Sequence, residues 1–252
     1  MLEIFLLSLI QGITEFLPVS SSSHLILFSN FINFSEAGLT IDVSLHIGSF
    51  LAVITYFNKD IFSFIKNRDL LLKIFISSIP VILVGYILVQ TNLIEELRNI
   101  KIIGWMTIIF GLVLYASDKF ELKKQINNNL NYKSALFIGF FQILSLIPGV
   151  SRSGITITAA RLLNFKRFDA AKISFLLSVP TLGAVSVFGI QKIIFSQSLS
   201  FSVVNLYSIL LSFIFSLITI KYFLKYIQNF SLAAFVIYRV LVGVILLVIA
   251  YL

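Results

Sequence analysis

The chain has 252 residues, of which 58% are hydrophobic and 12% are charged, and its mean hydropathy is +1.02. Soluble domains carry roughly 25% charged residues, about twice the fraction in this chain. Disulfide scaffolds need cysteine, which is absent here. Both classes are therefore excluded, and the composition indicates an integral membrane protein. The net charge of +8 does not indicate a nucleic-acid partner, because basic residues beside membrane spans meet anionic lipid headgroups.

In chain order, the first element is a broken one. Residues 1–34 are apolar but interrupted by Pro18 and four serines, and residues 134–165 are interrupted by "SLIPGVSRSG". Each region predicts a helix, an irregular polar tip and a second helix too short to span. Irregular backbone survives at membrane depth only where protein or a wet cavity covers it, so we interpret both regions as re-entrant hairpins.

Between and after these hairpins lie six apolar segments long enough to cross a bilayer, for which a helix needs about 20 residues. They cover residues 40–57, 70–91, 101–117, 171–194, 203–224 and 232–252.

The two broken regions resemble each other. "EFLPVSSSS" (15–23) and "SLIPGVSRS" (145–153) both run from apolar residues through proline to hydroxyls, at an offset of about 130 residues. Paired broken segments in corresponding halves indicate an inverted repeat with a site near the bilayer midplane. We therefore predict an all-α polytopic membrane protein, a single domain over 1–252, with about six transmembrane helices and two hairpins. Repeat 1 covers about 1–117 and repeat 2 about 134–252.

The basic residues divide the loops into two groups. Loops 58–69, 118–133, 161–172 and 221–231 together carry 13 Lys and Arg, whereas 29–39, 92–101 and 192–202 carry 3. Basic loops remain in the cytoplasm, so both termini and the mouth of the first hairpin are expected to face outward. The second hairpin then enters from the cytoplasmic side, as an inverted repeat requires.

Three ionisable residues, Glu15, His24 and Arg152, fall at the hairpin tips, and charge inside a membrane is a functional hypothesis by default. Gln11 and Glu15 are four residues apart and share a helical face, where their oxygens suit Mg²⁺ or Ca²⁺. A Gln–Glu pair that only solvates the cavity is the alternative. For three further intramembrane residues, structural and functional roles both remain open: Asp42, His46 and Arg239.

Hydroxyls surround these residues in both tips. Successive amides after each proline can form an anion-binding nest, and the planar guanidinium of Arg152 matches phosphate oxygens. The hydroxyls belong to Ser20, Ser21, Ser22, Ser23, Ser151, Ser153 and Thr156. A hydroxyl nucleophile, an acid or base and a cationic clamp together indicate phosphoryl transfer.

At this point the motifs resemble a known family. "QGITEFLPVSSSSHL" and "PGVSRSGITIT" are similar to the two signature motifs of the undecaprenyl-diphosphate phosphatases, the membrane phosphatases of bacitracin resistance, and "FLLSVPTLGAV" and "FVIYRV" extend the resemblance along the chain. The resemblance implies hydrolysis of a C55 polyprenyl diphosphate to undecaprenyl phosphate and inorganic phosphate during peptidoglycan synthesis. It also implies a divalent cation (Mg²⁺ or Ca²⁺) and a multi-pass protein of the bacterial inner membrane whose active site opens to the periplasmic side.

Carried over residue by residue, the resemblance assigns roles within the two tips. It implies a catalytic set of Ser21, His24, Glu15 and Arg152 and a metal held by Glu15 and Gln11. The chemistry of the two tips adds a predicted substrate-binding set: Gln11, Ser20, Ser22, Ser151, Ser153 and Thr156. The chain departs from the family pattern with Gln at position 11 and with Ser22-Ser23 where Thr-Gly is frequent. The nucleophile therefore stays open between Ser21 and its serine neighbours.

Other choices also stay open. Either Glu15 or His24 could take the proton from the nucleophile, and His24 could itself attack or activate water. A polyprenyl-phosphate carrier that uses the same cavity is the second hypothesis, since inverted repeats with midplane hairpins are a carrier architecture. A carrier needs no nucleophile, so Ser21 and His24 beside Glu15 favour an enzyme. A homodimer is compatible with the sequence, and no nucleic-acid partner is expected.

Overall fold

The computed structural model describes residues 1–32, 39–63, 68–91, 93–195 and 202–252. Within these ranges the regular elements are all helices, apart from one isolated bridge between Lys124 and Phe165. The prediction of an all-α polytopic membrane protein is confirmed.

Both broken regions form helical hairpins. The first consists of α1 (Leu2–Thr14) and α2 (Ser21–Ile32), and the second of α9 (Tyr132–Ile143), the 3-10 turn η1 (Leu144–Leu146) and α10 (Arg152–Leu162). These α-helices have 11 to 13 residues. At 1.5 Å per residue they reach about 20 Å at most, short of a hydrocarbon core of roughly 30 Å.

Five described helices are long and apolar enough to cross a membrane. They are α5 (Arg68–Gln90), α7 (Ile100–Asp118), α11 (Arg167–Phe195), α12 (Val203–Asn229) and α13 (Ala233–Tyr251). The sixth predicted span forms α3 (Leu39–Tyr56), whose apolar part, Thr40–Tyr56, is shorter than the other five. Three short helices lie in connections where the sequence predicted none: α4 (Asn58–Ser63), α6 (Leu93–Glu96) and α8 (Ile126–Asn129).

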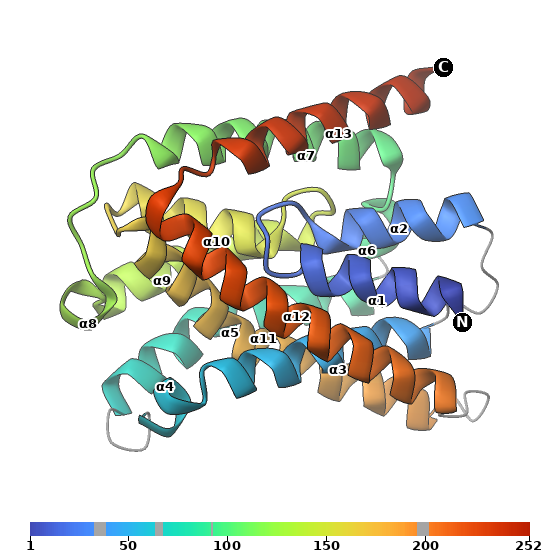
Figure 1. The fold of residues 1–252 in the computed structure, drawn as a ribbon, viewed down its shortest axis with the longest axis horizontal. Helices are drawn as coiled ribbons and strands as arrows, with labels where there is room; N and C mark the ends of the chain where they lie inside the picture. The colour runs from blue at the N-terminus through green and yellow to red at the C-terminus, as the bar shows by residue number, and fades with distance from the viewer. Residues whose placement is uncertain (33–38, 64–67, 92, 196–201) are drawn as a thin grey trace.

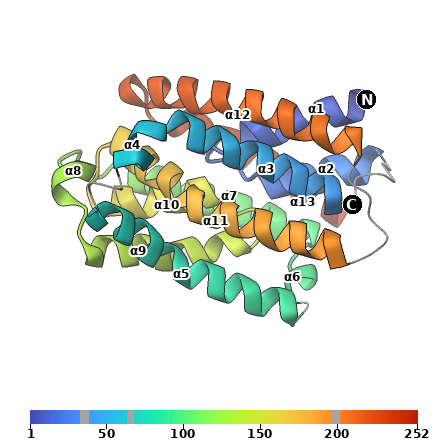
Figure 2. The same ribbon diagram turned by 90° about the horizontal axis from the view of Figure 1, so that it is seen from below.

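The connections are sorted to two ends of the helix bundle. Both chain termini lie at one end, and α4 and α8 lie at the other, in both views (Figures 1 and 2). The basic loops that contain α4 and α8 therefore share one end of the molecule, as the charge pattern required.

Each hairpin docks its first helix on a span from the other half of the chain. α1 packs against α12, and α9 packs against α5. Both contacts are close, because a Cβ added at Gly12 would overlap Phe215 and one added at Gly139 would overlap the Ser77 carbonyl. This exchange of partners is what an intertwined repeat produces, although the repeat boundaries themselves stay a prediction.

α10 lies inside the bundle rather than at its lipid-facing surface. Every residue from 153 to 161 is buried, and the helix packs against α7, α9 and α11. This cover explains how an irregular polar tip is tolerated at the start of α10, since surrounding protein replaces water around its backbone.

Candidate active site

The two hairpin tips have the same backbone geometry. Ser20 and Ser151 have φ values of 77° and 73°, and each directly precedes the first residue of a helix, α2 or α10. A non-glycine residue at positive φ costs about 1–3 kcal/mol and occurs preferentially at functional sites. The geometry makes Ser21 and Arg152 equivalent, because each is the first residue of its helix.

A carboxylate from the first tip is the centre of the site. Glu15 is only 7% exposed. Its Oε2 accepts hydrogen bonds from Ser21 Oγ at 2.7 Å and from Gln11 Nε2 at 3.1 Å. Its Oε1 pairs with Arg152 Nη2 at 2.5 Å, which joins the first tip to the second. The structure thus brings together a hydroxyl, a carboxylate and a guanidinium that the sequence predicted to share one site.

Aromatic packing fixes the orientation of the guanidinium. The Cζ of Arg152 lies 6.0 Å from the ring centroid of the fully buried Phe16, which packs edge-on against Phe175. Arg152 Nη1 lies 3.5 Å from the carbonyl oxygen of Ser174. Among the described residues, these contacts use only part of its five N–H donors, and the remainder can bind an anion.

His24 lies on the same hairpin but turns toward α13. Its Nδ1 lies 2.6 Å from the Ser20 carbonyl oxygen, and its Nε2 lies 2.6 Å from the hydroxyl of Tyr238. The two rings are stacked, with centroids 5.7 Å apart and planes 8° apart. Both ring nitrogens are therefore engaged outside the Ser21–Glu15 pair.

The predicted substrate-binding hydroxyls occupy different places. Ser20 Oγ lies 2.8 Å from Ser23 Oγ, and Ser151 Oγ accepts a hydrogen bond from the Gly154 amide as a helix cap. Ser153 Oγ donates to the Leu17 carbonyl at 2.7 Å and so bonds the second tip to the first.

Of the two remaining predicted hydroxyls, one lies away from Glu15 and the other belongs to a side chain that the structure does not describe. Thr156 is fully buried one turn into α10, where its hydroxyl lies 2.7 Å from Ser174 Oγ of α11. The side chain of Ser22 lies outside what the structure describes.

Arg239 of α13 holds both tips, a role that sequence reasoning left open. Its guanidinium is fully buried and donates to the carbonyl oxygens of Pro18 in the first tip and of Gly149 and Val150 in the second. A fourth hydrogen bond, from Nε, reaches Thr107 of α7. The sequence signals for Arg239 were its place inside an apolar segment and in "FVIYRV". Tyr238 in the same stretch and Phe16 in the first motif were given no role from the sequence, and neither was Ser174.

The site offers few oxygen ligands for a hard cation such as Mg²⁺ or Ca²⁺. The described residues contain no group of three or more His, Cys, Asp and Glu side chains that could hold a metal ion. Gln11 Oε1, however, is buried and has no hydrogen-bond partner among the described residues. One carboxylate and one amide oxygen therefore fit Mg²⁺ or Ca²⁺ that takes its other ligands from phosphate and water.

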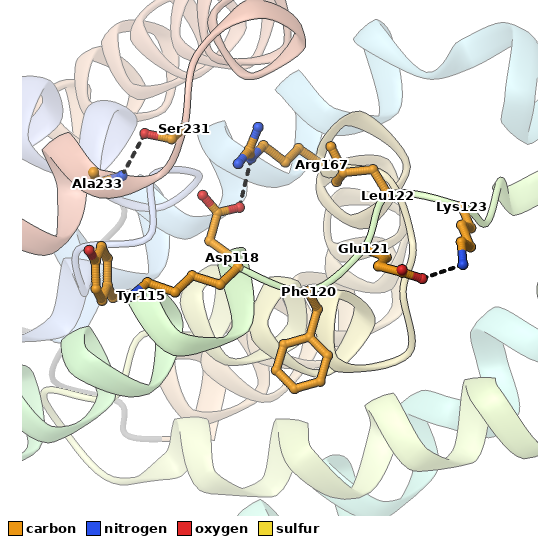
Figure 3. Close-up of a pocket in the computed structure, with 10 residues that line it drawn as sticks. Tyr115, Asp118, Phe120, Glu121, Leu122, Lys123, Arg167, Ser231 and Ala233 are labelled. Atoms are coloured by element: carbon orange, nitrogen blue, oxygen red, sulfur yellow. Dashed lines mark hydrogen bonds and ion pairs between the residues drawn. The ribbon is translucent and has the colours of Figure 1, made fainter.

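A separate surface pocket of about 710 Å³ lies where α7 ends and α13 begins (Figure 3). Asp118 in its wall pairs with Arg167, and Glu121 pairs with Lys123. The carbonyl of Asp118 accepts from Arg161. Arg161 lies roughly 14 Å along α10 from Arg152 at 1.5 Å per residue. The pocket is thus at the opposite end of α10, and its paired charges do not belong to the tip cluster.

Together these features define a multi-pass membrane protein in which two hairpin tips bring a hydroxyl, a carboxylate and a guanidinium together. The family profile described as "Bacitracin resistance protein BacA" matches residues 4–245. The chain belongs to this family, as the sequence motifs indicated.

Curated relatives are similar over almost their whole length. The chain is 50% identical to the undecaprenyl-diphosphatase of Pelagibacter ubique over 251 residues, which cover 99% of this chain and 98% of the relative. It is 41% identical to the undecaprenyl-diphosphatase of Jannaschia sp., with 98% of each covered. It is 38% identical to that of Roseobacter denitrificans, with 99% of this chain and 98% of the relative covered.

Proposed function

We propose that this protein is a membrane phosphatase that hydrolyses undecaprenyl diphosphate to undecaprenyl phosphate and inorganic phosphate. The observation that carries the proposal is the hydrogen bond from Ser21 Oγ to the buried carboxylate of Glu15, which is itself paired with Arg152. A nucleophile within reach of a base and beside a phosphate-binding cation is the arrangement that phosphoryl transfer needs. The names of the relatives support the same reaction. A carrier would need no such nucleophile.

In this mechanism Ser21 Oγ attacks the terminal phosphorus, and its proton passes to Glu15 Oε2, 2.7 Å away. An Oγ–P bond forms as the bridging P–O bond breaks, so undecaprenyl phosphate leaves. Water then attacks the phosphorus of the phosphoserine, the Oγ–P bond breaks, the proton on Glu15 returns to Ser21 Oγ, and inorganic phosphate is released. Glu15 is favoured over His24 as the base because Ser21 already donates to it, while both nitrogens of His24 contact other groups.

Arg152 binds the phosphoryl oxygens in the same mechanism. One of its terminal nitrogens is held by Glu15, which orients the planar fork, and its other donors face developing negative charge. Serine hydroxyls and tip amides complete the binding site on both sides.

A divalent cation, Mg²⁺ or Ca²⁺, would be held by Glu15 and by the unpartnered oxygen of Gln11. When bound, it would supply neutralisation of the negative charge on the diphosphate. The protein side chains around the site would then align Ser21 and keep water away from the carboxylate of Glu15.

The proposed setting is the bacterial inner membrane, with the basic end of the bundle in the cytoplasm. Positive loops favour that orientation, and the first hairpin then opens to the periplasmic side. The C55 tail of the substrate lies in the bilayer, while its diphosphate enters between the tips.

The test is release of inorganic phosphate from C55 diphosphate by the purified protein in nanodiscs, with Mg²⁺, with Ca²⁺ and with chelator. Phosphate release with either cation, absent in Ser21→Ala, is the expected result. Absence of release by the wild-type protein under every condition would overturn the phosphatase assignment.

A further inference from the structure

We propose that Tyr238 is a positioning residue that hydrogen-bonds Nε2 of His24 and holds the imidazole in its reactive orientation. The inference rests on the catalytic role that the family resemblance implies for His24, a role distinct from that of Glu15 as the base for Ser21. Tyr238 lies in α13, 214 residues from His24 in the sequence, and belongs to neither hairpin.

The hydrogen bonds around His24 determine its proton position. A carbonyl oxygen can only accept, so the 2.6 Å contact with the Ser20 carbonyl places a proton on Nδ1. In the neutral ring the other nitrogen, Nε2, then carries a lone pair. The hydroxyl of Tyr238, 2.6 Å away, donates to that lone pair. In this arrangement the basic nitrogen of His24 is Nε2.

The residues around His24 and Tyr238 hold the two side chains in this arrangement. Ser20 has a left-handed backbone, and it directs its carbonyl oxygen at Nδ1. On the other side, the neighbouring Arg239 bonds the Pro18 carbonyl and so fixes α13 against the same hairpin tip. Tyr238 is thus anchored at its backbone, and its ring stacks on the imidazole.

Packing alone does not account for the contact. Tyr238 is 42% exposed, so its hydroxyl could reach other polar groups, yet it lies at hydrogen-bond distance from one nitrogen of one histidine. Removing the hydroxyl while keeping the ring separates the two roles: Tyr238→Phe preserves the stacking and deletes the donor.

The first measurement uses side-chain nitrogen NMR on protein labelled with ¹⁵N-histidine, in which only two histidines contribute. In the wild type, Nδ1 of His24 is expected to be protonated and Nε2 to be a hydrogen-bonded acceptor. In Tyr238→Phe, the Nε2 resonance should shift, because its lone pair loses its hydrogen-bond donor, while Nδ1 stays protonated. His46, whose Nδ1 faces the Asp42 carbonyl, is the internal reference and should not change.

The second measurement is kinetic. Tyr238→Phe should lower kcat by about tenfold, a fraction of what a general acid or base contributes, and leave KM within about twofold. Tyr222→Phe, at an exposed tyrosine of α12, is the matched control and should have no effect. In a His24→Ala background, Tyr238→Phe should cost nothing further, because two residues that act as one unit are non-additive.

Three outcomes would overturn the proposal. Unchanged His24 resonances in Tyr238→Phe would show that the hydroxyl does not bond Nε2. A change in KM alone would make Tyr238 a substrate contact, and an undiminished loss in the His24→Ala background would make it independent of His24. If His24→Ala retains full turnover, the catalytic role of His24 fails instead, and the NMR result still decides whether Tyr238 donates to Nε2.

Discussion

Arg152 donates to Glu15 across the two hairpin tips at 2.5 Å, and the two residues are 137 positions apart in the chain. Their side chains are 13% and 6% exposed, so the pair is largely removed from water. A buried charge left without its partner is strongly destabilising, which couples the docking of the two tips to the assembly of the site.

Arg152→Lys tests whether the arginine acts as more than a charge. Lysine keeps the Coulombic attraction to Glu15, but it is a point donor and lacks the planar fork that bonds two phosphoryl oxygens. We expect a loss of at least about 100-fold in kcat/KM, roughly 3 kcal/mol, that falls mainly on kcat. Steady-state phosphate release across substrate concentrations would measure it.

The double variant Glu15→Gln with Arg152→Gln is the companion to this test. If the pair only neutralises charge, the double variant should fold and retain activity, and lysine should rescue the single change. Near wild-type turnover in Arg152→Lys would therefore return Arg152 to a structural role.

Ser21→Ala should abolish turnover while substrate binding persists, because the change removes only the attacking oxygen. Loss of a nucleophile costs several orders of magnitude in rate. Ser23→Ala is the control within the same run, since Ser23 Oγ contacts Ser20 Oγ and not the Glu15 carboxylate. Measuring substrate binding together with phosphate release would separate a loss of binding from a loss of turnover. If Ser23→Ala lost turnover and Ser21→Ala retained it, Ser21 would not be the nucleophile.

The contacts within a tip were accessible from the sequence because they are local. Gln11, Glu15 and Ser21 lie within one hairpin, and helical spacing predicts that the first two share a face. The cost of charge in a membrane indicated that Glu15 and Arg152 belong to a functional site. Their direct pairing across 137 positions of the chain was not predicted.

Contacts from other helices could not be predicted in this way. Arg239 is held by backbone carbonyls, which every residue carries, so its partners leave no pattern in the sequence. The direction of Thr156 depends on the packing of α10 against Ser174 of α11, a tertiary contact. Tyr238 was hidden because aromatic residues are common in apolar helices.

Arg239→Met should weaken the whole tip assembly. Methionine would leave the buried tip carbonyls of Pro18, Gly149 and Val150 without the donors of Arg239, and each unsatisfied group costs about 1–3 kcal/mol. We expect a lower Tm by scanning fluorimetry in detergent together with a loss of kcat. Arg68→Met, at an exposed arginine where α5 begins, is the control and should leave both unchanged. Equal effects of Arg239→Met and Arg68→Met would argue that Arg239 does not hold the two tips together.

Gly139→Ala should separate the second hairpin from α5. The added methyl would overlap the carbonyl oxygen of Ser77, and backbone cannot yield as a flexible side chain does. Overpacking costs about 1–3 kcal/mol or more, so Tm should fall by roughly 5 °C. Gly183→Ala is the control, because its methyl would meet the Phe50 ring at an ordinary 3.4 Å. Equal Tm values for the two variants would contradict the close approach of α9 and α5.

Gln11→Glu tests the proposed cation site. Gln11 Nε2 now donates to Glu15 Oε2, and glutamate would replace that donor by a second carboxylate about as close as the present 3.1 Å. Without a cation, two buried like charges repel and one must take up a proton. With Mg²⁺ or Ca²⁺, the same two carboxylates would share the ion. The variant should therefore lose several °C of Tm in chelator, recover it with cation, and keep phosphatase activity at saturating cation.

Gln142→Glu supplies the matched control for this change. Gln142 is equally buried in the second hairpin, and neither atom of its amide has a hydrogen-bond partner among the described residues. A carboxylate at position 142 lies outside the proposed cation site. The Tm of Gln142→Glu should therefore fall by a similar amount with and without Mg²⁺. If Gln11→Glu behaves in the same way, unaffected by cation, then Gln11 serves as a neutral hydrogen-bond donor to Glu15 and the two residues do not hold a metal. Recovery by cation in Gln11→Glu alone would assign the ion to the first hairpin.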